Sequence, residues 1–170
     1  MSEDRLWALV DRARQHDDDL PGQLDFIDNA LAQSTPSEVL EVHAGLMSAH
    51  RRAYTEELLA AFELAMGYVG DDSFTDARSW LILHGRTTFD RVVADPDELA
   101  EILFNDEEVL GLAEQFAALI LEHAEAHGDD VELPEDLDNL AGPPVPRDIP
   151  GLRARFPRIA ASYPRPLGPR

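Results

Sequence analysis

One short stretch of the chain gathers residue types that could hold an anionic or planar ligand. Asp71 and Asp72 form an acidic pair, and Arg78, Trp80 and Arg86 follow close behind. A guanidinium group donates paired hydrogen bonds to carboxylate or phosphate oxygens, and it also stacks on planar groups. These five residues are therefore the candidate ligand-binding set, and an enzyme built on this chain would use the same set.

The same stretch also fits a purely structural role. Carboxylates in the first turn of a helix interact favourably with its positive end. Both arginines would then pair with these acids, and the tryptophan would pack in the core. Replacing Arg78 or Arg86 with Leu separates the two interpretations. Stability falls under the structural role because buried acids lose their partner, whereas ligand affinity disappears under the other.

Histidines recur at helical spacing in two places. His123 and His127 are four residues apart, which puts both on one face of a helix, as in a helical metal clip. The string reads His-Ala-Glu-Ala-His rather than the His-Glu-x-x-His of zinc proteases. Histidines near a helix C-terminus also interact favourably with its dipole. They are weak metal candidates, and we predict no metal site and no cofactor.

A second stripe combines His43, Met47, His50 and Tyr54 at offsets of four, three and four. A histidine-lined pocket is one interpretation. The edge of a hydrophobic core is the other, and it accounts better for the methionine and the tyrosine.

Composition removes several classes of chemistry. The chain has no Cys, which excludes disulfides, thiol catalysis and Cys-based metal sites. It has no Lys, which excludes a P-loop. No serine lies in a Gly-x-Ser-x-Gly setting, and no apolar run reaches the ~18 residues of a membrane helix. We expect a cytoplasmic protein without membrane contact.

Charge divides the 170-residue chain, whose formal net charge is −20. Residues 1–146 contain 33 acidic residues and eight Arg, whereas residues 147–170 contain six Arg and one acid. A GC-rich genome or a salt-adapted proteome would explain the acidity without any function. An acidic surface disfavours nucleic acid, although the Arg-rich tail could contact it.

The tail's nearest acidic partner is its own body. We expect the tail to bind this body in cis, or a neighbour in a homodimer. An apolar clasp would support either contact, formed by Ile149, Leu152, Phe156 and Ile159.

The elements that position these residues are helices. Apolar side chains recur at helical spacing over most of residues 2–127, and Thr35-Pro36-Ser37-Glu38 is a strong helix start. The predicted breaks lie at 17–22, near 49–55, at 67–72, at Gly85 and at Gly128, and Asp95-Pro96-Asp97-Glu98 predicts a further capping box. A short strand near Val131 and Leu133 would have no partner. We predict an all-α fold: a single helical domain of about seven helices over residues 1–140. An extended Pro/Arg-rich tail, loose or packed on the domain, spans 141–170.

Several short sequence motifs, taken together, match the sequence pattern of one known family. They are Gly70-Asp71-Asp72-Ser73-Phe74, Arg78-Ser79-Trp80-Leu81-Ile82, Gly85-Arg86, Asp95-Pro96-Asp97-Glu98-Leu99-Ala100 and the opening Leu6–Arg14. Over about residues 4–104 the chain resembles the bacterial family catalogued as domain of unknown function 4240. The resemblance implies a helical bacterial domain and supplies no activity.

No catalytic set stands out beside this core. We therefore expect a non-enzymatic protein-interaction module whose partner is a protein, a second copy included. The alternatives are a small-molecule-binding domain or enzyme using Asp71, Asp72, Arg78 and Arg86, and nucleic-acid contact through the tail.

Overall fold

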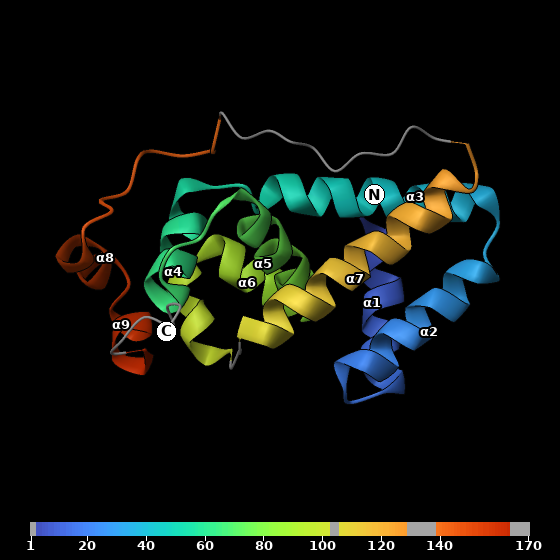
Figure 1. Ribbon diagram of the computed structural model, residues 1–170, viewed down its shortest axis with the longest axis horizontal. Coiled ribbons are helices and arrows are strands. Elements are labelled where there is room, and N and C mark those ends of the chain that lie inside the picture. The colour runs from blue at the N-terminus through green and yellow to red at the C-terminus, as the bar shows by residue number, and fades with distance from the viewer. Residues whose placement is uncertain (1–2, 103–105, 129–138, 164–170) are drawn as a thin grey trace.

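The computed structural model describes residues 3–102, 106–128 and 139–163, with the side chains of 106–110 left out. These ranges contain nine α-helices, one 3-10 helix (η1) and no strand, as the sequence predicted for the fold class (Figure 1). The helices are α1 Asp4–His16, α2 Leu20–Ala32, α3 Pro36–Arg52, α4 Glu56–Met66, α5 Asp71–Leu83, α6 Arg86–Ala94, η1 Pro96–Glu101, α7 Asp106–Glu125, α8 Ile149–Arg155 and α9 Pro157–Ser162. The possible strand near Val131 falls outside the described residues.

Side-chain caps open five of the helices, α2, α3, α4, η1 and α8. Thr35 and Glu38 form the predicted capping box at α3. At α2 the prediction was wrong in one respect, because Pro21 and Gly22 lie inside the first turn of the helix. The side chain of Asp19 accepts the Gly22 N–H there, and proline suits the first turn because its missing N–H has no partner in the helix anyway.

One later break lies where the sequence predicted it, and one later element differs from the expected helix. The run after Thr35 is two helices separated at residues 53–55, where Thr55 caps α4 by accepting the Leu58 N–H. Asp95 caps a short 3-10 helix by accepting the N–H of Asp97, in place of the predicted capping box of an α-helix.

The tail is not extended, and this expectation was wrong for residues 149–162. Each of its short helices has a proline in the first turn, Pro150 in α8 and Pro157 in α9. Proline fixes φ near the helical value, so it can start a helix that it could not continue.

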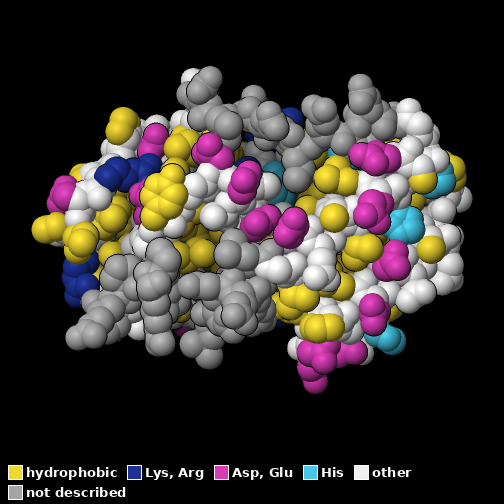
Figure 2. Space-filling view, viewed as in Figure 1, with side chains coloured by type: hydrophobic (Ala, Val, Ile, Leu, Met, Phe, Trp, Pro, Cys, Tyr) yellow, Lys and Arg dark blue, Asp and Glu magenta, His cyan; other side chains and the backbone are white. Residues whose placement is uncertain are grey.

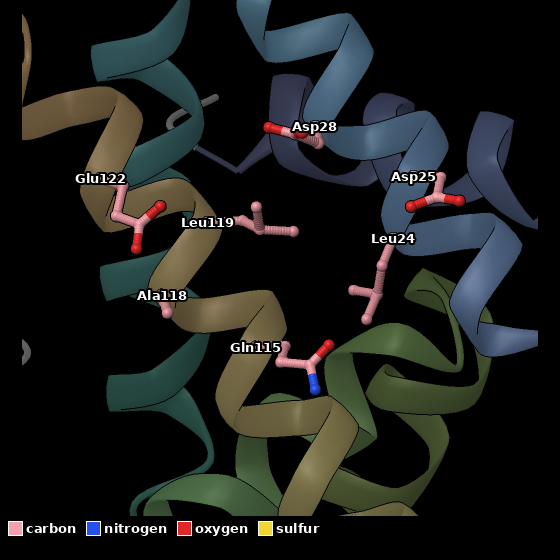
Figure 3. A pocket seen from close by; sticks show the side chains of 7 residues that line it. All are labelled: Leu24, Asp25, Asp28, Gln115, Ala118, Leu119 and Glu122. Carbon is pink, nitrogen blue, oxygen red and sulfur yellow. The ribbon is translucent and has the colours of Figure 1, made fainter.

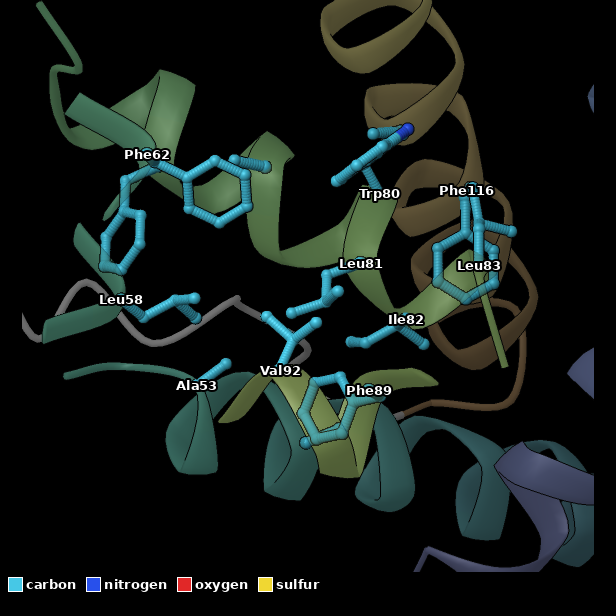
Figure 4. Close-up of a cluster of buried hydrophobic side chains, with 14 of the residues drawn as sticks. Ala53, Leu58, Phe62, Trp80, Leu81, Ile82, Leu83, Phe89, Val92 and Phe116 are labelled. Carbon is cyan, nitrogen blue, oxygen red and sulfur yellow. The ribbon is translucent and has the colours of Figure 1, made fainter. Parts of the chain in front are cut away.

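A central hydrophobic core holds the helices together. α7 crosses the molecule in front of α3 and α5 and also packs on α2, while α8 and α9 lie at the far end beside α4 and η1 (Figure 1). Phe62, Trp80, Phe89 and Phe116 are almost completely buried in this core (Figure 4).

Gly85 separates α5 from α6 and has φ 85° and ψ 164°. An added Cβ would lie 2.9 Å from Asp11 Oδ1. We expect Gly85→Ala to lower the free energy of unfolding by about 1–3 kcal/mol, because this backbone region is nearly restricted to glycine. Urea denaturation measures the change. Gly111→Ala in α7, where nothing lies within 4 Å of the added carbon, should instead raise stability slightly.

Candidate functional site

The five residues of the predicted ligand-binding set do not share one surface. Asp71 and Asp72 are exposed in the first turn of α5, whose N-cap residue is Gly70. Trp80 is only 1% exposed and Arg78 only 5% exposed, on the buried side of the same helix. Ligand binding by this set stays a prediction, and two of its five members are buried.

The arginines do not pair with the Asp pair either. Arg86 donates to Asp4 at 3.1 Å and lies 3.7 Å from Asp90. Arg78 has no carboxylate partner among the described residues, so the predicted ion pairs with Asp71 and Asp72 are wrong.

Arg78 instead ties α5 to the end of α3. Its guanidinium donates to the backbone oxygens of His50 at 3.0 Å and Phe74 at 3.3 Å, and to Thr75 Oγ1 at 3.1 Å. It also lies within 5 Å of the ring centroids of Tyr54 and Phe74. Burial lowers the pKa of Arg78 to about 10, which leaves it charged at neutral pH. This cation is a structural anchor.

The second histidine stripe belongs to the core edge. His50 is 1% exposed, and its Nε2 lies 2.9 Å from the hydroxyl of the fully buried Ser79. Burial, and then the charge of Arg78, lower the pKa of His50 to about 3. A solvent-borne substrate would not reach this His–Ser pair, so it is not a candidate nucleophile.

The two weak metal candidates, His123 and His127, have different surroundings. His123 Nε2 contacts Asp28 Oδ1 at 2.7 Å, whereas His127 is exposed in the turn after α7. In the ranges that the structure covers, no three His, Asp or Glu side chains come together as a metal site would require.

The C-terminal segment (residues 139–163) packs on the body through an apolar centre. Leu152, Phe156 and Ile159 are each at most 5% exposed, as the predicted clasp requires. Ile149 is 62% exposed, so its predicted place in the clasp was wrong. Tyr163 donates its hydroxyl hydrogen to the backbone oxygen of Ile102 at 3.0 Å.

Ion pairs surround this apolar centre. Arg147 contacts both Glu56 and Glu63 of α4, and Arg155 contacts Glu57 of the same helix. Arg158 contacts Glu98 at 2.7 Å and Glu101 at 3.5 Å in η1. Figure 2 shows the basic side chains gathered at this end of the molecule. The expected cis contact between the tail and its own acidic body is present in this segment.

Asp97 holds the start of α9. Its carboxylate, only 7% exposed, accepts the backbone N–H groups of Arg158 and Ile159 at 2.9–3.1 Å. A carboxylate at a helix N-terminus satisfies N–H groups that have no partner within the helix. We call Glu56, Glu57, Glu63, Asp97 and Glu98 the acceptor face.

Sequence reasoning missed the acceptor face. One signal was present, because Glu56 and Glu63 are seven residues apart and therefore share a helix face. Asp97 gave no such signal, since its role depends on a segment about 60 residues further along the chain.

A second surface feature lies between α2 and α7. A pocket of about 240 Å³ is lined by Leu24, Asp25, Asp28, Gln115, Ala118, Leu119 and Glu122 (Figure 3). The sequence gave no sign of it, because its two walls are about 90 residues apart.

Comparison with known proteins identifies a family. The family model described as "Protein of unknown function (DUF4240)" matches residues 1–139, further than the strings noted in the sequence extend. No curated protein and no solved structure matches the chain. Among the described helices, none has the length and apolar character of a membrane span.

Proposed function

We propose that this chain, which belongs to the DUF4240 family of proteins of unknown function, is a protein-interaction module. Its acceptor face would bind Arg-bearing, partly apolar segments of proteins, and the C-terminal segment would be the occupant that the chain itself carries. A cytoplasmic setting, a bacterial source and a homodimeric state stay predictions from the sequence.

One observation carries this proposal: the body already binds such a segment. The family match ends at residue 139, where the C-terminal segment begins. The contact has an apolar centre, Leu152, Phe156 and Ile159, with charged pairs around it. Protein–protein interfaces have this arrangement of an apolar core and a polar rim.

The two alternatives have weaker support. A small-molecule site at Asp71–Arg86 would have to use Arg78 and Trp80, which are buried. Nucleic-acid contact would have to use tail arginines, and three of them, Arg147, Arg155 and Arg158, are paired with carboxylates.

A labelled peptide with the sequence of residues 145–163 tests the proposal. We expect it to bind the full chain weakly, because the cis segment competes for the same face. Phe156→Ala in the full chain weakens that competitor, and we expect peptide affinity to rise about tenfold or more. Fluorescence anisotropy measures the affinity, which should fall as salt is added.

The control is Leu31→Ala, which truncates a buried side chain in α2, far from the acceptor face. It should lower stability without raising peptide affinity. Amide exchange at residues 152–163 reports whether Phe156→Ala has released the segment. A released segment with no peptide binding would overturn the proposal.

A further inference from the structure

We propose that the groove between α2 and α7 binds the side chain of an arginine from a partner protein. This site lies apart from the acceptor face. It extends the proposed function to a second surface, and its test does not depend on the first.

The groove combines an apolar floor with a charged rim. Leu24 and Leu119 point toward each other across the gap between the two helices (Figure 3). Asp25 and Asp28 stand on the α2 side and Glu122 on the α7 side, all three exposed. Gln115 lies toward the other end of the pocket. An aliphatic stem could therefore lie on the two leucines while its cationic end meets carboxylates from both walls.

The three carboxylates of the rim differ in their partners within the part of the chain that the structure describes. His123 contacts Asp28 at 2.7 Å. Asp25 and Glu122 have no ion pair among the described residues. Figure 2 shows acidic side chains alternating with apolar ones over this face of the molecule.

Elsewhere on the same surface, arginines bridge acids of this kind. Arg5 contacts Glu38 and Glu41, and Arg147 contacts Glu56 and Glu63. Further bridges of this type are Arg52 between Glu3 and Asp90, and Arg158 between Glu98 and Glu101. The groove also carries carboxylates on both of its sides, with an apolar floor added and no described arginine among its lining residues.

The size and the lining of the groove favour one arginine over other occupants. At about 240 Å³ it is smaller than the roughly 300–1,000 Å³ of pockets that enclose whole small molecules. The acidic rim repels anions. A planar guanidinium has donors on several edges and can bridge carboxylates on two helices.

The test uses N-acetyl-L-arginine amide, which carries the side chain on a capped backbone as a protein does. We expect saturable amide shifts in α2 and α7 of the ¹⁵N-labelled full chain. N-acetyl-L-citrulline amide has nearly the same shape without the charge and should give none.

Matched variants locate the site. Glu122→Gln should weaken binding of the arginine amide about two- to fivefold, as expected for losing one exposed ion pair. Glu125→Gln is one turn further along α7, is also exposed and does not line the groove, so it should leave binding unchanged. Phe156→Ala should also leave these shifts unchanged. A negative result at the groove would therefore not count against the proposal for the acceptor face.

Three results would overturn the proposal. They are the absence of saturable shifts in α2 and α7, equal shifts with the citrulline compound, and no difference between Glu122→Gln and the wild type.

Discussion

On acidification from pH 7.5 to pH 5, the buried His50 and the partly buried His84 together are expected to lower the free energy of unfolding by roughly 4 kcal/mol. Burial and the charge of Arg78 lower the pKa of His50 to about 3. Burial and the charge of Arg14 lower the pKa of His84 to about 4. Both side chains are therefore neutral in the folded protein over this range.

The direction of this change in stability follows from the protons that the folded and unfolded states bind. Above the ordinary histidine pKa of 6.5, both states are neutral at these positions and stability does not change. Below it, the unfolded chain takes up a proton at each histidine and the folded chain does not. Each histidine then removes about 1.4 kcal/mol per pH unit until its folded-state pKa is reached.

Two other groups, Asp76 and Glu3, also have shifted pKa values. Between pH 6.5 and pH 5 the change in stability nevertheless comes mainly from the histidines. Burial, with repulsion from Glu114 and Asp72, raises the pKa of Asp76 to about 6. Asp76 therefore acts in the opposite direction and offsets about 1 kcal/mol of this loss, because solvent screening reduces its effect at a partly exposed side chain. Burial acts to raise the pKa of Glu3, but hydrogen bonds from Ser48, Trp7 and Arg52 lower it overall. The stability from Glu3 is therefore lost only as the pH falls below about 4.5.

Urea denaturation at pH 8.5, 7.5, 6 and 5 measures the slope. The values at pH 8.5 and 7.5 should agree, which serves as the internal control. His84→Phe keeps an aromatic ring beside Trp80, whose contact with His84 is edge-on at 4.4 Å. This variant should lose about half of the slope. Equal stability at pH 7.5 and pH 5 would contradict the prediction.

Local chemistry made much of the fold predictable. The capping box at Thr35 and the glycine stop at residue 85 depend on residues within one turn of each other, so the sequence alone indicates them. The two tail helices were missed because their prolines were interpreted as breaks. Proline in a first turn is compatible with a helix, and the apolar Leu152, Phe156 and Ile159 stabilise these helices by packing on the body.

The candidate site was less predictable, because residues that are close in sequence can lie on different faces of a helix. Asp72 and Arg78 are six residues apart, which is about 600° of rotation and places them on different faces. Arg78 follows Phe74 by four residues, so it lies on the same face of α5 as Phe74, and this face packs toward the core. The hydrogen-bond partners of Arg86 and Arg147, Asp4 and Glu63, are more than 80 residues away, and only tertiary packing selects them.

Arg78→Ala is expected to lower the free energy of unfolding by about 3–5 kcal/mol. Truncation leaves a cavity beside Tyr54 and Phe74. It also removes the donor to the backbone oxygen of His50, which lies in the last turn of α3, where carbonyl groups lack helical partners. The sequence also predicted a loss of stability, but for the different reason that buried acids would lose a partner.

Two further variants separate the contribution of the guanidinium group to stability from that of its aliphatic stem. Arg78→Met keeps most of the packing on both rings, so its loss measures the hydrogen bonds and the cation–π contacts, about 2 kcal/mol. Arg78→Lys keeps the charge but cannot reach three acceptors at once, and it should fall between Met and the wild type. Thr75→Val removes one acceptor of Arg78 and should lower stability by about 1 kcal/mol or less.

The outcome for Arg78→Met decides which effect dominates at this site. A buried cation without a carboxylate partner carries a desolvation penalty, and replacing it with an apolar side chain can be neutral or stabilising. Three hydrogen bonds and two aromatic faces surround this guanidinium, so we expect the loss of these contacts to outweigh the relief. Wild-type stability in Arg78→Met, measured in urea at pH 7.5, would contradict the anchoring role and return Arg78 to the ligand-binding hypothesis.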